Sequence, residues 1–230
     1  MGANPIIIAG GGHAGIEAAL AISRMGCKAL IITLDPKSIG RMSCNPAIGG
    51  LAKGHIVKEI DALGGIMGKA ADFSGIQFKT LNKSKGRAVW SPRAQVDKLK
   101  YTQFIQNKIS LDENINVIAG EVVDFTVNNS NISSVILKDC TTYHCASLII
   151  TAGTFLNGLI HIGERKFRAG RMGEKPAIGL TESLINNGFS VGRLKTGTPP
   201  RLLSSSIDWE QTLLAPGDEI PSPFSINSID

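Results

Sequence analysis

The sequence has few cysteines and no long hydrophobic run. Its four cysteines are unevenly spaced along 230 residues, so they do not make a disulfide framework, and a reducing compartment is favoured. No histidine pairs with a cysteine at the spacing of zinc ligands, so no metal site is predicted. No apolar run is long enough to cross a bilayer, and the apolar start indicates a buried strand rather than a signal peptide. These absences predict a soluble, cytoplasmic protein without a membrane segment.

Basic residues are lacking from one end of the chain. Residues 202–230 hold five of the 19 acidic residues and none of the 24 lysines and arginines. Between Lys79 and Lys100, by contrast, seven basic residues accompany a single acid, Asp97. Such a surplus suits a polyanion, a phosphate-rich cofactor or a nucleic acid. A solvated surface face is the alternative that charge alone leaves open.

A glycine motif between a strand and a helix is the first feature that indicates function. The apolar run Pro5–Ala9 predicts a strand buried on both faces of a parallel sheet. Gly10, Gly12 and Gly15 follow at the spacing G-x-G-x-x-G. Gly10 permits a tight turn, Gly12 lets the backbone approach a pyrophosphate, and Gly15 lets the helix lie close to the strand. The helix N-terminus would point its free N–H groups at that pyrophosphate.

The segments after this motif indicate which dinucleotide it binds. The acid that usually ends the second strand is replaced by Thr33, and Asp35 follows two residues later, so its role at the ribose stays open. Farther along we expect a helix at about 93–110, an antiparallel β-meander at about 115–146 and a returning strand at Ser147–Thr151. This order resembles the FAD-binding half of two-dinucleotide-binding-domain flavoproteins, in which FAD occupies the first glycine motif.

Two longer motifs narrow the resemblance. They are S-C-N-P-A-I-G-G at residues 43–50 and G-R-L-K-T-G-T-P-P-R at residues 192–201. With them, from about residue 5 to the C-terminus, the sequence resembles the tRNA uridine 5-carboxymethylaminomethyl modification enzymes, the MnmG (GidA) family. The fold class implied is α/β, with a Rossmann-like FAD-binding domain, including the meander, at residues 1–200. Residues 201–230 would begin a second, NADH-binding or insertion domain, and the C-terminal part of the family fold would be missing.

The resemblance also implies site residues. It places the FAD loop on consecutive residues and a further FAD contact on the start of a later strand: Gly10, Gly11, Gly12, His13, Ala14, Gly15 and Val122. It places the first of two cysteines implicated in the chemistry on Cys44. It implies no metal.

The activity that the resemblance implies is an FAD-dependent tRNA modification. With the GTPase MnmE, an aminomethyl or carboxymethylaminomethyl group is added to C5 of the wobble uridine. NADH and methylenetetrahydrofolate would be co-substrates, and the enzyme would be a homodimer. This chain would be an N-terminal fragment that folds only partly, binds FAD weakly and is inactive alone. A folate- and FAD-dependent tRNA uridine methyltransferase and a non-catalytic FAD- or RNA-binding module are the alternatives.

Cys44 has the surroundings of a reactive thiol. A helix is expected just after Gly49 and Gly50, and its N-terminus, with Lys53 and His55, favours an accessible thiolate. A thiolate that adds to the uracil ring makes C5 nucleophilic, which is covalent catalysis. The alternatives for Cys44 are that it moves a proton, packs in a loop, or belongs to a redox disulfide, although Gly49 stands where such reductases carry their second cysteine. Three other cysteines are interpreted as structural: Cys27, Cys140 and Cys145.

Trp90 stands within the basic stretch. It is accompanied by Lys83, Lys85, Arg87 and Arg93, a mixture that suits phosphates and unstacked bases. A base that undergoes ring chemistry must first leave its stack. The sequence therefore predicts an RNA-binding stretch here, with a core position for Trp90 as the alternative.

Overall fold

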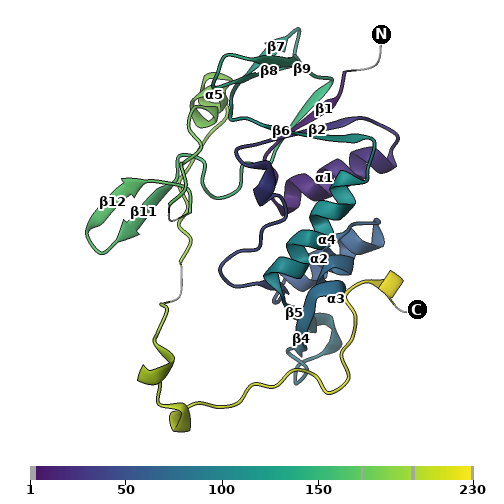
Figure 1. Ribbon diagram of the computed structural model, residues 1–230, viewed down its shortest axis with the longest axis vertical. Coiled ribbons are helices and arrows are strands. Elements are labelled where there is room, and N and C mark those ends of the chain that lie inside the picture. The colour runs from purple at the N-terminus through teal and green to yellow at the C-terminus, as the bar shows by residue number, and fades with distance from the viewer. Residues whose placement is uncertain (1–3, 172, 198–199, 229–230) are drawn as a thin grey trace.

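The structure is a computed structural model that describes residues 4–171, 173–197 and 200–228 (Figure 1). The strands are β1 (Ile6–Ala9), β2 (Ala29–Thr33), β3 (Ala47–Gly49), β4 (Gly75–Leu81), β5 (Ser91–Val96), β6 (Ile115–Ala119), β7 (Val122–Asn128), β8 (Asn131–Leu137), β9 (Thr142–His144), β10 (Ser147–Ile150), β11 (Leu159–Ile162) and β12 (Arg165–Arg168). The helices are α1 (His13–Arg24), α2 (Lys53–Ala62), α3 (Met67–Ser74), α4 (Lys98–Ser110) and α5 (Leu180–Asn186). Residues 1–3 of the first predicted domain, and Thr198 and Pro199 of the second signature motif, lie outside the described residues.

A parallel sheet in the order β10-β1-β2-β6 organises the molecule. Ile6 of β1 lies opposite Ala29 of β2 on one side and Ser147 of β10 on the other. β1 and β2 are almost wholly buried, as expected of short apolar strands covered on both faces. Helix α1 crosses from β1 to β2 and packs on one face, while the β7–β9 layer lies on the other (Figure 1). The predicted α/β, Rossmann-like fold is confirmed.

Two predicted boundaries are wrong. Residues 115–119 form β6, which pairs in parallel with β2, so the antiparallel meander β7-β8-β9 begins at Val122 rather than at 115. The helix expected at about 93–110 begins at Lys98, because residues 91–96 pair with β3 and β4. The side chain of Asp97 caps this helix by accepting the N–H groups of Leu99 and Lys100 at 2.8 and 3.0 Å, a standard N-terminal signal.

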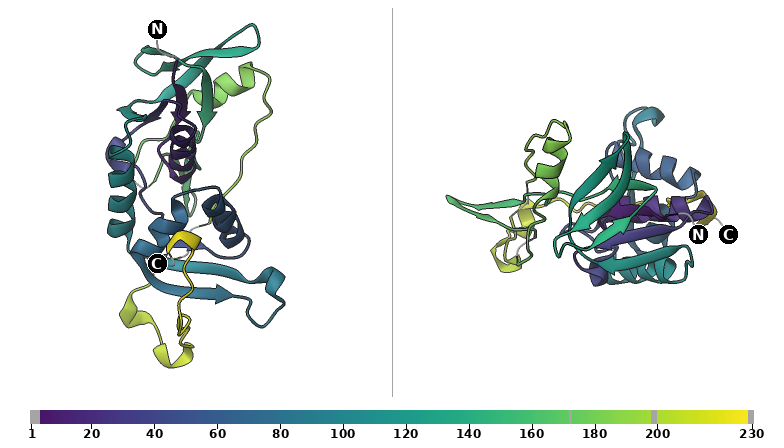
Figure 2. Two further views of the ribbon diagram at one scale, coloured as in Figure 1. Left: turned by 90° about the vertical axis from the view of Figure 1, so that its right-hand side faces the viewer. Right: turned by 90° about the horizontal axis from the view of Figure 1, so that it is seen from above.

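A second layer lies between β2 and α4 in the sequence. The antiparallel sheet β3-β5-β4 carries helices α2 and α3. Its long β4–β5 hairpin extends away from the parallel sheet (Figure 2). Glu17 of α1 joins the two layers, because its carboxylate accepts the N–H groups of Ile66 and Met67 at the start of α3. This acid therefore occupies the anion-favouring end of α3.

The C-terminal segment returns to this second layer. Residues 200–216 are irregular apart from two short 3₁₀ helices, Ser204–Ser206 and Trp209–Gln211. Beyond them, Phe224 is fully buried against the layer. Asp72 accepts the N–H groups of Phe224 and Ser225 at 2.7 and 2.8 Å, and Asp61 accepts that of Ile226 at 3.0 Å. The expected domain beginning at residue 201 stays a prediction, but its last described residues pack on the first 100.

Within the described residues, no helix is both long enough and apolar enough to cross a membrane.

Candidate functional site

The turn after β1 requires two of its glycines. Gly10 has a φ of +121°, and a Cβ there would lie 2.4 Å from the carbonyl oxygen of Thr151. A Cβ on Gly15 would lie 2.0 Å from the carbonyl oxygen of Gly10. The returning strand is therefore part of the turn: the N–H of Thr151 donates to Ala9 and its hydroxyl donates to Gly10. This contact fixes the carboxyl ends of β1 and β10 side by side, where open α/β sheets bind ligands.

Gly12 is different, because its missing side chain faces open space. A Cβ there would meet no heavy atom within 4 Å, and its φ of −77° is ordinary. Among the described residues no side chain caps the N-terminus of α1, and its first turn holds no acid. The first N–H groups of the helix are thus free for an anion. The loop predicted to bind FAD fits a pyrophosphate at Gly12, with Ala14 exposed beside it.

The carboxyl end of β2 forms the adjoining wall. A Cβ on Gly11 would lie 3.2 Å from the side chain of Thr33, so these two segments are in close contact. Asp35 lies just beyond, where its carboxylate accepts the N–H of Lys37 at 3.0 Å.

Val122 begins β7 near the same edge of the sheet. The N–H of Gly120 donates to the carbonyl oxygen of Thr33 at 2.9 Å, so this segment reaches the end of β2. The side chain of Val122 is buried with Ile32 and Leu137. Any contact of Val122 with a cofactor is therefore expected through its backbone.

His13 links the helix N-terminus to the loop that carries Cys44. Its Nε2 atom lies 3.3 Å from Sδ of Met42, and its ring stacks on Tyr101 of α4 with 5.5 Å between centroids. Burial, reinforced by the positive charge of Arg171, lowers the pKa of His13 below its usual 6.5. The imidazole is therefore neutral near pH 7 and adds no charge to the anion site.

Cys44 lies on an exposed bend between residues 41 and 46. Lys98 Nζ donates to the carbonyl oxygen of Cys44 at 3.2 Å. The hydroxyl of Ser43 donates to the backbone carbonyl oxygen of Asn45 at 2.7 Å. The backbone of the bend is thus held while the thiol stays accessible. Helix α2 begins at Lys53, close to the predicted start after Gly49 and Gly50.

The other cysteines are free thiols. Cys27 and Cys140 are exposed and Cys145 is buried. Burial raises the pKa of the Cys145 thiol, so this thiol is the least prepared to react. None of them is bonded to Cys44.

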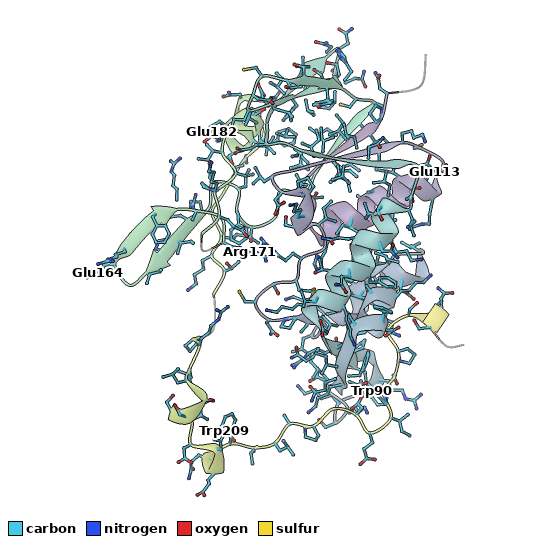
Figure 3. The ribbon with its side chains drawn as sticks, viewed as in Figure 1. Trp90, Glu113, Glu164, Arg171, Glu182 and Trp209 are labelled. Carbon is cyan, nitrogen blue, oxygen red and sulfur yellow. The ribbon has the colours of Figure 1, made fainter. Side chains whose placement is uncertain are left out.

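Sequence reasoning missed Arg171 and Glu174, two residues of the segment after β12 that contact the Cys44 bend. Arg171 Nη1 donates to the carbonyl oxygen of Met42 at 3.2 Å, and Arg41 pairs with Glu174. Figure 3 shows Arg171 reaching from this segment toward the body of the molecule. The basic residues Arg165, Lys166, Arg168 and Arg171 were visible in the sequence, but nothing local indicated that Arg171 contacts Met42.

The middle of the basic stretch, residues 82–90, forms the tip of the β4–β5 hairpin. Trp90 is 37% exposed, so a core position for it is wrong. Its Nε1 donates to the carbonyl oxygen of Lys85 at 3.0 Å, and the guanidinium of Arg87 lies 5.6 Å from the ring centroid. Lys83 pairs with Asp218 at 3.0 Å, which offsets part of the positive charge. Figure 3 places Trp90 at the end of the molecule opposite the β7–β9 layer.

Comparisons with known proteins agree with this geometry. Residues 5–229 match the family model "Glucose inhibited division protein A". The chain is 50% identical to the tRNA uridine 5-carboxymethylaminomethyl modification enzyme MnmG of Protochlamydia amoebophila, over 93% of this chain and 34% of that protein. It is 51% identical to the protein of the same name from Chlorobaculum tepidum, over 97% of this chain and 36% of that protein.

Solved structures give the same picture. GidA of Aquifex aeolicus superposes with a TM-score of 0.90 and 48% identity, over 97% of this chain and 37% of that one. A GidA-related protein from Thermus thermophilus, with a TM-score of 0.59 and 15% identity, shares the fold. The chain thus spans about a third of the length of the relatives that it matches.

Proposed function

The chain belongs to the glucose-inhibited division protein A (GidA) family, and we propose that it is the FAD-binding part of an enzyme that modifies tRNA. The reaction proposed for the whole enzyme is the addition of a carboxymethylaminomethyl or aminomethyl group to C5 of the wobble uridine. The observation that carries the proposal is the position of the anion site at Gly12 beside the Cys44 bend, with His13 in contact with Met42.

The cofactor site in this proposal consists of Gly10, Gly11, Gly12, His13, Ala14, Gly15 and Val122. Gly12 leaves room for the pyrophosphate of FAD, and the free N–H groups at the start of α1 would donate to it. Gly10 and Gly15 keep the strand, helix and returning strand close enough to form the turn. When bound, FAD would supply the redox capacity of the reaction.

Cys44 is the proposed nucleophile. Its thiolate would add to C6 of the uracil, forming an S–C6 bond while the electron pair of the C5–C6 double bond shifts into an enolate. C5 would then attack a one-carbon electrophile. Loss of the C5 proton and expulsion of the thiolate would restore the double bond, so the thiol is regenerated. The exposed bend, held by Lys98 at the Cys44 carbonyl, supports this role because the thiol is accessible and its backbone is fixed.

The tip of the β4–β5 hairpin is the proposed contact with tRNA. Trp90 offers a stacking surface, and Lys85 and Arg87 offer charge to the phosphates. The five acids and absent basic residues of the C-terminal segment make that segment a poor RNA surface.

The remaining components are proposed on the family resemblance alone. They are the GTPase MnmE as partner, NADH and methylenetetrahydrofolate as co-substrates, a homodimer and a cytoplasmic location. The 230-residue chain alone is proposed to be inactive, because it spans only about a third of the relatives' length.

The experiment that tests the RNA contact is a titration with a fluorescein-labelled anticodon stem-loop, followed by fluorescence anisotropy. Trp90→Ala should weaken binding by roughly 5- to 150-fold, the equivalent of about 1–3 kcal/mol for one stacked base. Lys85→Ala should lower the salt dependence of binding by about one unit of slope. The matched control is Trp209→Ala, an exposed tryptophan in the acidic segment, which should change neither. Native RNA affinity in Trp90→Ala together with a native salt dependence in Lys85→Ala would refute this interface.

A further inference from the structure

The β11–β12 hairpin stands apart from the rest of the molecule. Figures 1 and 2 show it projecting from the body below α5. Its two strands form a sheet of their own, in which all four residues of β12 and three of the four of β11 are exposed. A lone two-stranded hairpin is at best marginally stable in water. Its side chains therefore serve no core of their own and are available to a partner.

Cross-strand pairing sorts these side chains onto two faces. Directly opposed residues of an antiparallel pair share a face, and successive residues alternate between faces. One face consists of two opposed pairs, Leu159 with Arg168 and His161 with Lys166. The other face consists of the remaining two pairs, Ile160 with Phe167 and Ile162 with Arg165. The first, called here the basic face, thus carries both Lys166 and Arg168, whereas the second is apolar except for Arg165.

The charge of the basic face is only partly compensated. In the described part of the chain, neither Lys166 nor Arg168 has a carboxylate oxygen within 4.0 Å. Glu182 of α5 senses Arg168, since its pKa is lowered chiefly by the hydrogen bond from Asn157 and also by the charge of Arg168. The acid within the hairpin is Glu164, which Figure 3 labels at the outer end. The face therefore presents a net positive charge to solvent.

The hairpin leads directly to the Cys44 bend. Arg171 follows three residues after Arg168, and its Nη1 donates to the carbonyl oxygen of Met42 at 3.2 Å. Three residues of chain span at most about 11 Å, so the inner end of the basic face lies close to this contact. Trp90, by contrast, lies at a distant end of the molecule (Figure 3). The basic face is thus the charged surface that adjoins the bend.

We propose that the basic face of the β11–β12 hairpin binds the sugar–phosphate backbone of the RNA beside the base that reaches Cys44. The inference rests on the proposed function, since it adds a second contact with the same RNA. Lys166 and Arg168 pair with phosphates, and a guanidinium can hold one through two hydrogen bonds. Enzymes that act on an extruded base also contact its flanking nucleotides. The β4–β5 tip would then bind the RNA, and the hairpin would position it at the thiol.

An acidic protein surface is the competing partner for such a face. Protein interfaces have an apolar centre surrounded by a polar rim. The apolar residues of this hairpin lie on the other face, except for Leu159. A charged face without an apolar centre therefore favours a phosphate backbone.

The first test is a titration of the fluorescein-labelled anticodon stem-loop at several salt concentrations, followed by fluorescence anisotropy. Lys166→Gln and Arg168→Gln should each lower the slope of log affinity against log salt by about one unit, and weaken binding roughly fivefold at physiological salt. The matched control is Arg165→Gln, which removes the same charge from the other face and should change neither quantity. All three side chains are exposed, and circular dichroism checks that each variant is folded.

The second test asks where the bound RNA lies. Maleimide labelling of each cysteine is followed by mass spectrometry, with the exposed Cys27 and Cys140 as references. With RNA at ten times its Kd, about a tenth of the chain is free, so labelling of Cys44 should slow about tenfold. Labelling of the two references should not slow. In the double variant Lys166→Gln/Arg168→Gln, at the same fraction bound, Cys44 should be labelled nearly as fast as without RNA.

The outcomes separate this inference from the proposed function. Native affinity and slope in the double variant overturn the hairpin contact, and if Trp90→Ala still weakens binding, the contact at the β4–β5 tip stands. Equal losses in Arg165→Gln and Lys166→Gln overturn the basic face, because they would reflect overall charge. Rapid labelling of Cys44 in the native complex overturns the position of the RNA.

Two further outcomes concern the partner itself. Poly-glutamate that binds the native chain as tightly as the RNA, and loses affinity in Lys166→Gln, assigns the face to an acidic protein and overturns the proposal. A native chain that binds no RNA overturns both this contact and the one proposed at the β4–β5 tip.

Discussion

Substitutions at two glycines of the turn after β1 should have opposite effects: a side chain at Gly15 should lower stability, and one at Gly12 should lower FAD affinity. Gly15→Ala places a methyl group where the structure leaves 2.0 Å to the carbonyl oxygen of Gly10 and 2.9 Å to the hydroxyl of Thr151. Both neighbours are fixed, one by being backbone and the other by its hydrogen bond to Gly10. Overpacking of this kind costs up to about 3 kcal/mol. For a chain of this size, the melting temperature should fall by about 6–12 °C.

Gly12→Val should instead leave the fold nearly unchanged. The position has a φ of −77° and a ψ of −177°, which valine adopts readily. Nothing lies within 4 Å of the new Cβ, so the cost is confined to the helix cap and is below about 1 kcal/mol. The isopropyl group would fill the space assigned to the pyrophosphate. FAD affinity should then fall by at least about 100-fold, or about 2.8 kcal/mol.

The assay separates the two effects. The affinity of the native chain and of each variant for FAD is measured by equilibrium titration, and thermal unfolding of the FAD-free protein is followed by circular dichroism. Gly12→Val with native stability and an FAD affinity at least about 100-fold below that of the native chain is the expected result. Native FAD affinity in Gly12→Val would refute the pyrophosphate site. An undiminished melting temperature for Gly15→Ala would refute the close approach of helix and strand.

Three further predictions concern the thiols, the buried histidine and the C-terminal segment. A maleimide should label three cysteines rapidly in the native chain and Cys145 only after unfolding, and Cys44→Ser should reduce the rapid count to two. The pKa of His13 is lower in the folded chain, so its contribution to stability is present above pH 6.5 and is lost as the pH falls through the folded-state value. Urea unfolding at pH 7.5, 6.5 and 5.5 should show this loss of stability. The His13→Gln variant should lose less stability over the same pH range. Phe224→Ala removes a fully buried ring, costs about 3–5 kcal/mol locally and should expose residues 201–222 to limited proteolysis, whereas Trp209→Ala should not.

Local sequence signals predicted the parallel core well, because the residues that are buried there also favour the strand and turn conformations that they adopt. The run Pro5–Ala9 is apolar throughout, and the glycine spacing marks the turn into α1. The helix at about 93–110 was misplaced because one local signal was overlooked. Asp97 is an N-terminal cap, and it was present in the sequence.

Other features could not be predicted from local signals. The strand at 115–119 is a short, largely apolar run that does not differ in kind from the strands of the meander. Only its pairing with β2 assigns it to the parallel sheet. The docking of Phe224 depends on Asp72, which lies 152 residues earlier. Such contacts leave no periodic trace, since a carboxylate that accepts backbone N–H groups can stand anywhere in the chain.

Helix α4 connects the two parts of the candidate site, although no motif marks it. Tyr101 on its buried face stacks on His13 at the start of α1, and Lys98 in its first turn holds the carbonyl oxygen of Cys44. His13 in turn touches Met42, two residues before the thiol. A shift of α4 would therefore move the anion site and the Cys44 bend together. The distance between the proposed cofactor site and the thiol thus depends on helix α4, which contacts His13 on one side and the Cys44 bend on the other.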